Sequence, residues 1–395
     1  MVSLRFGGLA ARAFHMISTL RSNQASSSSY AEHSLLAAKA LQQSWYDEPS
    51  GLWATTGWWN SANCLTVLTD WAAHSGALAH GLNVPEVIAT TFTNAQKVSV
   101  EARKTVSASG QVTSNYSFHQ KDKRGFSEFI NEFYDDEGWW ALALVRSWDV
   151  THNKDYLDMA EHIFRDMQNG TDNTCGGGIW WSKEKAYKNA IANELYLSVA
   201  ASLANRVRGK ELEYTRIAKD EWEWFKNSGM INDKNLINDG LKINDDGKCV
   251  NNGMTTWSYN QGVVLGGLVE LSKATGDALY LSEAVTIGKA AVERLSDENG
   301  IIREADRCEP NCGADGAQFK GIFVRNLQYL QRAAPQDVFE AAIQKNADSI
   351  WAHNRNSKNQ LGIAWAGPPE LGDGPTAGTH SSAMDVIVAA MAISS

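Results

Sequence analysis

The chain has little proline, few cysteines and no long apolar run, and each shortage narrows what the protein can be. Only 7 of its 395 residues are proline, which favours a helix-rich fold because proline breaks helix interiors. No stretch of about 18 uncharged apolar residues occurs, so the sequence predicts no transmembrane span. Lysine and arginine do not cluster and the formal net charge is -9, so we expect no nucleic-acid partner.

The five cysteines are Cys64, Cys175, Cys249, Cys308 and Cys312. The last two flank a short Glu-Pro-Asn loop, and we expect a local disulfide between them; two free thiols are the alternative. An odd count leaves at least one thiol free if every bond is intramolecular. No second cysteine or histidine pair has zinc-finger spacing, so we expect no metal site.

The N-terminal segment has the composition of a targeting sequence. It is rich in arginine and serine and has no acidic residue before position 32, which is also typical of a mitochondrial presequence. Arg12 interrupts the apolar run that a secretory signal needs. The sequons that begin at Asn115 and Asn169 favour the secretory route, because N-glycosylation occurs there. We therefore expect a secreted or cell-surface protein with an atypical N-terminal signal.

From Tyr30 onward, apolar residues recur with the period of amphipathic helices. The predicted helices cover residues 31–47, 59–80, 85–106, 125–150, 154–168, 186–206, 211–226, 258–275, 279–296, 315–331, 335–354 and 378–393. Twelve helices make six hairpins, and a closed ring of six hairpins is an all-α (α/α)6 barrel. Short links would lie on one side of the ring, while long loops gather around a cleft on the other. A helical solenoid is the alternative, although no fixed-length repeat occurs. Residues 178–181 could form a strand with a later partner.

Asp135 and Asp136 stand in an acidic run between aromatic residues, in the segment Tyr134–Trp140. One interpretation is a helix N-terminus, with Asp135 as the cap and the following acids complementing the helix dipole. The flanking rings favour a sugar site instead, because aromatic faces stack on pyranose rings. A glycosidase needs two carboxyl groups, about 5–5.5 Å apart for retention of anomeric configuration and about 6.5–9.5 Å for inversion. We expect both aspartates just before the helix, where looser backbone lets them reach one substrate atom.

Further aromatic and polar clusters recur at predicted helix starts, over residues 58–63, 176–181, 189–194 and 257–262. Each alone is better explained by packing than by binding, but their common position predicts a shared cleft. His380, at the start of the last helix, could bond a sugar or be an ordinary side chain near a cap. No serine-hydrolase, zinc-protease or nucleotide-binding motif occurs, so we expect no cofactor.

The segment Asn131–Ala143 resembles the catalytic motif of glycoside hydrolase family 76, which comprises endo-α-1,6-mannanases and fungal cell-wall relatives. The resemblance continues in order through residues 176–181, 188–194, 257–262 and 319–327. It covers most of the chain from about residue 30 to the end. Several matched motifs in the right order are more specific than an aspartate pair alone.

The resemblance implies an (α/α)6 barrel without metal and with retention of anomeric configuration. It assigns Asp135 as the nucleophile and Asp136 as the general acid/base. Residues 1–29 would then be a targeting or disordered segment, and residues 30–395 one catalytic domain. We expect a monomer that binds α-mannan or a mannose-containing glycan. The expected substrate contacts are Asn131, Trp139, Asn193, Asp239, Tyr259, Gln261 and His380.

Two other functions remain open at the level of sequence. The family also contains fungal proteins thought to act as cell-wall transglycosylases on mannose-containing glycolipid anchors. Those relatives typically carry a C-terminal anchor signal, whereas residues 390–395 form no long hydrophobic tail after a spacer, so a soluble hydrolase is favoured. A non-catalytic mannan-binding protein is the third hypothesis, and it would bind mannan without turnover.

Overall fold

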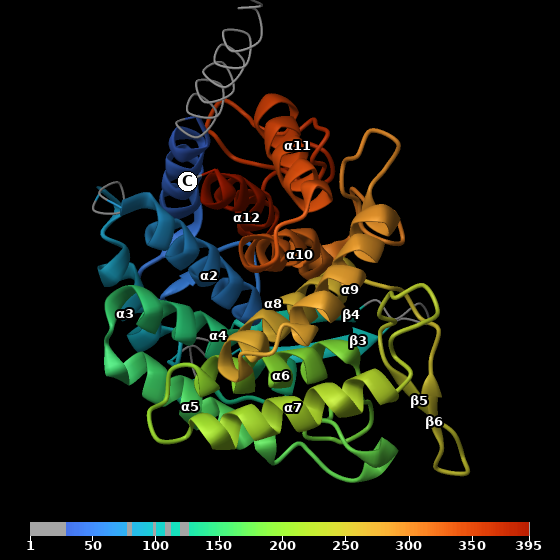
Figure 1. Cartoon of the computed structure of the whole chain (residues 1–395). Coiled ribbons are helices and arrows are strands. Elements are labelled where there is room, and N and C mark those ends of the chain that lie inside the picture. The colour runs from blue at the N-terminus through green and yellow to red at the C-terminus, as the bar shows by residue number, and fades with distance from the viewer. Residues whose placement is uncertain (1–28, 77–80, 98–99, 107–111, 119–125, 395) are drawn as a thin grey trace, which may run out of the picture.

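The computed structural model describes residues 29–76, 81–97, 100–106, 112–118 and 126–394. The predicted targeting segment, residues 1–29, lies outside these ranges except for its last residue. Within them the chain is mainly helical, and Figure 1 shows the helices winding around a common centre.

The inner helices form a closed ring in which each helix packs against the next and the last packs against the first. They share long buried stretches; α12, for example, is buried along nearly its whole length. A helix that is apolar on all sides belongs inside a core. The inner helices are α2 (Trp58–Ser75), α4 (Tyr134–Thr151), α6 (Ala190–Ala204), α8 (Ser258–Thr275), α10 (Gly313–Ala333) and α12 (Ala377–Ile393).

The outer helices are amphipathic and cover the ring. In α5 the buried residues follow helical spacing, as in Tyr156, Ala160, Ile163 and Met167. The outer helices are the one over residues 29–45, α3 (Val84–Asn94), α5 (Lys154–Gln168), α7 (Glu211–Asn227), α9 (Leu279–Leu295) and α11 (Asp337–His353). Each outer helix precedes an inner one, so the predicted all-α (α/α)6 barrel of six helical hairpins is confirmed.

In the described part of the chain, three small antiparallel strand pairs lie in the loops that precede inner helices. They are β1 (Tyr46–Asp47) with β2 (Leu52–Trp53), β3 (Val100–Val106) with β4 (Val112–Phe118), and β5 (Leu241–Ile243) with β6 (Cys249–Asn251). In Figure 1 the β5–β6 pair projects from one side of the molecule. Short 3-10 turns cover Ser127–Phe129 and Thr174–Gly176.

Two predicted helices are wrong in part, and both errors flank the β3–β4 pair. The helix predicted over 85–106 ends at Asn94, and its last residues form β3. The helix predicted over 125–150 begins only at Tyr134. Residues 100–106 pair in register with β4, and Val100, Thr105 and Val106 are residue types that favour strands. The strand expected at 178–181 is only an isolated bridge from Ile179 to an earlier residue, Thr171.

Loops before the inner helices are fixed by a repeated hydrogen bond. In five of the inner helices, the fourth residue accepts a hydrogen bond from the backbone N–H of the preceding loop. A buried backbone donor without a partner would be costly, so these bonds hold the loops at the helix starts. The pairs, with the donor first, are Trp53–Ser61, Asn131–Glu137, Ile179–Asn193, Ile237–Gln261 and Leu361–His380.

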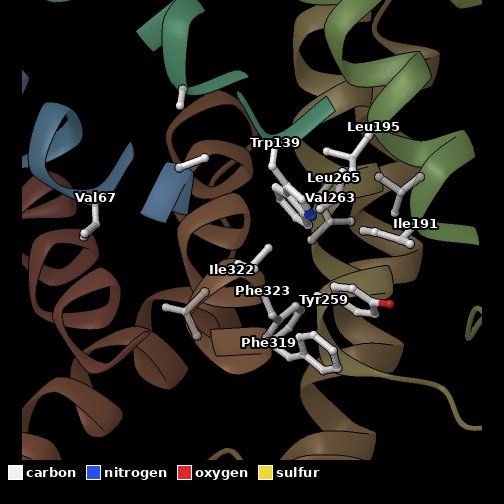
Figure 2. Close-up of a cluster of buried hydrophobic side chains, with 14 of the residues drawn as sticks. Val67, Trp139, Ile191, Leu195, Tyr259, Val263, Leu265, Phe319, Ile322 and Phe323 are labelled. Atoms are coloured by element: carbon white, nitrogen blue, oxygen red, sulfur yellow. The ribbon is translucent and has the colours of Figure 1, made fainter. Parts of the chain in front are cut away.

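Trp139 fills the centre of the barrel one helical turn below the loop end of α4. Figure 2 shows it among Leu195 of α6 and Val263 of α8, with Tyr259 and Phe319 lying face to face nearby. The last two rings stack with centroids 3.8 Å apart. Trp139 itself is 3% exposed, so the barrel is a packed core at this level.

The opposite end of the barrel holds a chain of ion pairs. Arg146 bonds Asp70 and Asp149, and Arg206 bonds Asp149 and Glu270, with nitrogen–oxygen distances between 2.5 and 3.0 Å. Both arginines and Glu270 line a cavity of about 340 Å³ beneath Trp139. The pairs join the ends of four inner helices, where cations also complement the negative end of each helix dipole.

Candidate active site

Asp135 and Asp136 lie in the first turn of α4, which begins at Tyr134. The N-cap residue is Phe133 and no side chain caps this end, so the interpretation of Asp135 as the cap is wrong. The expectation of looser backbone ahead of the helix is wrong too. Neighbours on a helix point about 100° apart, yet these two carboxylates still reach a common point in space.

That common point is occupied by the ammonium group of Lys104, from β3. Its Nζ donates to Oδ1 and Oδ2 of Asp135 at 3.1 and 3.0 Å, and to Oδ1 of Asp136 at 2.5 Å. Because Asp135 Oδ2 and Asp136 Oδ1 bond one nitrogen, at 3.0 and 2.5 Å, they are at most about 5.5 Å apart. The two carboxylates therefore face each other across a gap that one ammonium group fills.

Asn131 holds Asp136 from the other side. Its Nδ2 donates to Asp136 Oδ2 at 2.8 Å, while its Oδ1 accepts from the backbone N–H of Phe133 at 2.8 Å. Asp136 is fully buried. Burial raises the pKa of Asp136 to about 7, and the charge of Asp135 adds to this, while Lys104 and Asn131 oppose it. This carboxyl can therefore carry a proton near neutral pH.

Aromatic faces flank the carboxylates. The Lys104 ammonium lies 4.5 Å from the ring centroid of Phe133 and 5.5 Å from that of Trp181. The indole N–H of Trp181 is buried and has no hydrogen-bond partner within the described part of the chain. Below them, Trp139 stacks on Trp59 with centroids 5.5 Å apart. The carboxylates thus lie between aromatic walls and an aromatic floor.

A second group of acids surrounds Tyr259. The hydroxyl of Tyr187 donates to Asp239 Oδ2 at 2.5 Å. Burial raises the pKa of Asp239 to about 7, with the charge of Asp135 contributing. Burial also raises the pKa of Glu194 well above its usual range, and the charge of Asp239 adds to it. Asp239 and Tyr259 are therefore close enough to Asp135 for its charge to act on both.

Three predicted substrate contacts are instead engaged with backbone. Asn193 bonds both the N–H and the carbonyl of Ile179, and Gln261 bonds both groups of Ile237. His380 Nδ1 accepts from the N–H of Leu361, and its Nε2 faces the carbonyl of Ala37 at 2.9 Å. All three side chains are fully buried. They position the loops around the site, and their polar atoms are already used.

The loop before α6 is held by Lys188, whose side chain is fully buried. Its Nζ donates to the carbonyl oxygens of Thr174, Gly177 and Gly178 at 2.8, 2.6 and 3.0 Å. The Asp172 carboxylate, 3.2 Å away, and these backbone carbonyls together compensate the buried ammonium charge. These bonds hold in place the loop from which Trp181 reaches the active site.

Two disulfides are present. One joins Cys308 to Cys312, and the other joins Cys175, in the loop before α6, to Cys249 of β6. The second pair spans 74 residues, and nothing in the local sequence points to it. Cys64 is a free, buried thiol.

Both sequons lie in described parts of the chain. Asn169 is exposed at the end of α5, and Asn115 lies in β4. Within the described ranges, no helix is long and apolar enough to cross a membrane. The same ranges contain no group of three or more His, Cys, Asp or Glu side chains arranged to hold a metal ion.

The sequence of the chain matches a family model over nearly its whole length. The model of glycosyl hydrolase family 76 matches residues 25–394. The chain belongs to glycosyl hydrolase family 76. The predicted membership is therefore confirmed, and the match includes the carboxylate pair and every inner helix.

Curated members of family 76 share moderate identity with this chain. Mannan endo-1,6-alpha-mannosidase DFG5 of Candida albicans is 28% identical over 288 residues, which are 67% of this chain and 61% of that protein. Mannan endo-1,6-alpha-mannosidase DCW1 of the same organism is 30% identical over 228 residues, 53% of this chain and 49% of that protein. The matches thus span about half to three fifths of the curated relatives.

Solved structures of family 76 share the fold. An inactive variant of the α-1,6-mannanase GH76A of Salegentibacter sp. HEL1_6, with two consecutive aspartates replaced by asparagine, was solved with α-1,6-mannotriose. It superposes with a TM-score of 0.75 at 20% identity, covering 93% of this chain and 100% of that one. Dfg5 from Chaetomium thermophilum, in complex with glucosamine, gives a TM-score of 0.73 at 17% identity, covering 92% of this chain and 90% of that one.

Several residues of this family 76 site escape sequence reasoning. Lys104 is hidden because its segment is predicted as helix, and residues 100–106 show no clear strand alternation. Phe133, Trp181 and Lys188 lie within the segments that carry the resemblance, but nothing in the sequence shows what their side chains contact. Tyr187 carries no local signal, because its partners come from distant loops.

Proposed function

We propose that this chain is a retaining, endo-acting glycoside hydrolase that cleaves α-1,6-mannosidic linkages in mannan. The observation that carries the proposal is the carboxylate pair, whose facing oxygens are at most about 5.5 Å apart, since Lys104 Nζ bonds them at 3.0 and 2.5 Å. This limit fits the separation of about 5–5.5 Å in retaining glycosidases and is shorter than the about 6.5–9.5 Å of inverting ones. The names of the curated relatives support the substrate class.

In the proposed mechanism, Asp135 is the nucleophile and Asp136 the general acid/base. The Asp135 carboxylate attacks the anomeric carbon, the bond from that carbon to O6 of the leaving sugar breaks, and Asp136 gives its proton to O6. Water then loses a proton to Asp136 and bonds to the anomeric carbon, which releases Asp135. The raised pKa of Asp136, about 7, supports its role as the acid, because a proton donor must be protonated at the working pH.

The neighbouring groups have supporting roles in this proposal. Asn131 orients Asp136 through its 2.8 Å hydrogen bond. Phe133 and Trp181 offer ring faces and one free indole N–H to the sugar. Asp239 and Tyr259 are buried beside this site, and the charge of Asp135 contributes to the raised pKa of each. The α-1,6-mannotriose complex of the related mannanase supports a mannan glycan as the ligand.

The setting of the activity is part of the proposal. We infer a monomer that is secreted or exposed at the cell surface, with residues 1–29 as the targeting segment and residues 30–395 as the catalytic domain. The naming of the fungal relatives as mannosidases of mannan supports contact with a cell-wall polysaccharide. Asn169 is exposed and so can accept a glycan, and Asn115 is the second candidate.

Product analysis tests the proposal. Linear α-1,6-mannan is incubated with the protein, with and without added α-1,6-mannotriose as acceptor, and the products are sized while their anomeric configuration is followed by proton NMR. We expect shorter oligosaccharides that first appear as the α-anomer. Incorporation of the added mannotriose into longer products would show transglycosylation in place of hydrolysis, and first appearance of the β-anomer would refute retention. Binding without any product would favour a non-catalytic mannan-binding protein.

A further inference from the structure

Lys104 occupies the space in front of both proposed catalytic groups. Its ammonium makes three hydrogen bonds to Asp135 and Asp136, and its side chain is only 1% exposed. It also lies over the rings of Phe133 and Trp181. A group of this chain therefore fills the point on which two carboxylates and two aromatic faces converge.

With Lys104 in this position, the two carboxylates leave little surface that a sugar could reach. The side chain of Asp135 is 11% exposed and that of Asp136 is fully buried. The second oxygen of Asp136 is bonded to Asn131, and Trp139 closes the barrel one turn below. Attack requires the anomeric carbon to come within about 3–3.5 Å of the nucleophilic oxygen. The lysine ammonium already stands at that distance from it.

The element that carries Lys104 reaches across the mouth of the barrel. Among the described residues, β3 pairs with β4 and with no other strand, and β4 packs against α10. In the ring, α10 is three helices away from α4 and so lies opposite the carboxylate pair. A two-stranded pair outside any larger sheet is marginally stable alone. Withdrawal of β3 from the site would leave the contacts between neighbouring inner helices in place, because these helices pack on one another directly.

We propose that Lys104 is an autoinhibitory contact, a tethered cation that occupies the sugar subsite and that the substrate must displace. The inference rests on the proposed function of this site, and it concerns how the site is regulated. In the closed form the lysine ammonium is hydrogen-bonded to both buried carboxyl groups. Glycan binds only the open form. Its apparent affinity is therefore the affinity of the open form multiplied by the fraction of molecules that are open.

The test compares Lys104→Ala and Lys104→Met with wild type, with Lys242→Ala as the control. Lys242 is an exposed lysine of another strand pair, and the methionine keeps most of the aliphatic stem in case alanine disturbs β3. Circular dichroism establishes that each variant is folded. The first measurement is carbodiimide-driven amine labelling of Asp135, mapped by mass spectrometry. The second is kcat/KM on linear α-1,6-mannan.

We expect both Lys104 variants to label at Asp135 where wild type and Lys242→Ala do not. We also expect kcat/KM to rise about tenfold or more, if the lysine-bound form is about 90% or more of the wild-type population. Equal labelling of all proteins would overturn the proposal, because Asp135 would not be covered. Increased labelling with a lower kcat/KM would overturn it too, since the lysine would then assist the reaction. Increased labelling without mannan cleavage by any protein would support the contact and refute the proposed function.

Discussion

The hydrogen bond from Asn131 to Asp136 offers a direct test of how the proposed acid is tuned. The bond stabilises the ionised carboxylate, and so it lowers the pKa of Asp136 against the larger effect of burial. Replacing Asn131 by alanine removes the donor. A hydrogen bond to a charged group contributes about 1.5–3 kcal/mol, and one pKa unit corresponds to about 1.36 kcal/mol. The pKa of Asp136 should therefore rise by about one to two units.

The sign of the effect on activity follows from the role of the proton. Asp136 works as an acid only while protonated, so activity is present below its pKa and is lost as the pH rises through it. With the wild-type pKa raised to about 7, the basic limb of kcat/KM should fall near neutral pH. In Asn131→Ala this limb should move to higher pH by about one to two units. Asn131→Asp loses the donor and adds a like charge, so its limb should move further in the same direction.

The assay is the pH profile of kcat/KM on linear α-1,6-mannan. Asn356→Ala is the matched control, because Asn356 also accepts a backbone N–H two residues later but lies in a different loop. Its profile should coincide with that of wild type. A basic limb that stays in place in Asn131→Ala, or that moves to lower pH, would refute the assignment of Asp136 as the proton donor.

Two further predictions concern stability, measured as the free energy of unfolding in urea. Gly178 and Gly247 have nearly the same positive φ, 78° and 79°, but a Cβ at Gly178 would lie 2.3 Å from the Trp224 ring while one at Gly247 would meet nothing. Alanine should cost both positions about 1–2 kcal/mol of backbone strain, and Gly178→Ala about 1–3 kcal/mol more for overpacking; equal losses would contradict the packing argument. Arg206→Met should cost about 1.5–3 kcal/mol because half-buried Glu270 loses its arginine partner, although Asp149 keeps its pair with Arg146, whereas Arg216→Met breaks an exposed pair worth about 0.3–0.5 kcal/mol. A loss of under about 1 kcal/mol for Arg206→Met would show that the ion pairs at the end of the barrel opposite the carboxylates contribute little to stability.

The fold could be predicted from sequence because its signals are local and repeated. Each outer helix has one apolar stripe, as in Tyr156, Ala160 and Ile163, and each long loop precedes an inner helix. The carboxylate pair was visible for the same reason, since Asp135 and Asp136 are consecutive. The backbone conformation of the two aspartates could not be predicted, because aspartate also suits a helix cap or a loop.

The errors arise where a residue's partner is far away in the sequence. An amide side chain can bond a sugar hydroxyl or a loop backbone equally well, so the sequence cannot tell which one Asn193 and Gln261 bind. The structure shows both amides paired with backbone. Lys104 is missed because residues 100–106 have no clear helix or strand period. Cys175 and Cys249 are 74 residues apart, and only the folded chain brings them together.

The most direct test of the central claim is turnover of linear α-1,6-mannan by Asp135→Asn and Asp136→Asn, each compared with wild type. Asp246→Asn, at an exposed position in the turn between β5 and β6, serves as the control. Thermal unfolding establishes that all four proteins are folded. We predict that wild type and Asp246→Asn release shorter oligosaccharides, while both active-site variants release none above background. Turnover at the wild-type rate by either active-site variant would contradict the assignment of Asp135 and Asp136 as the catalytic pair.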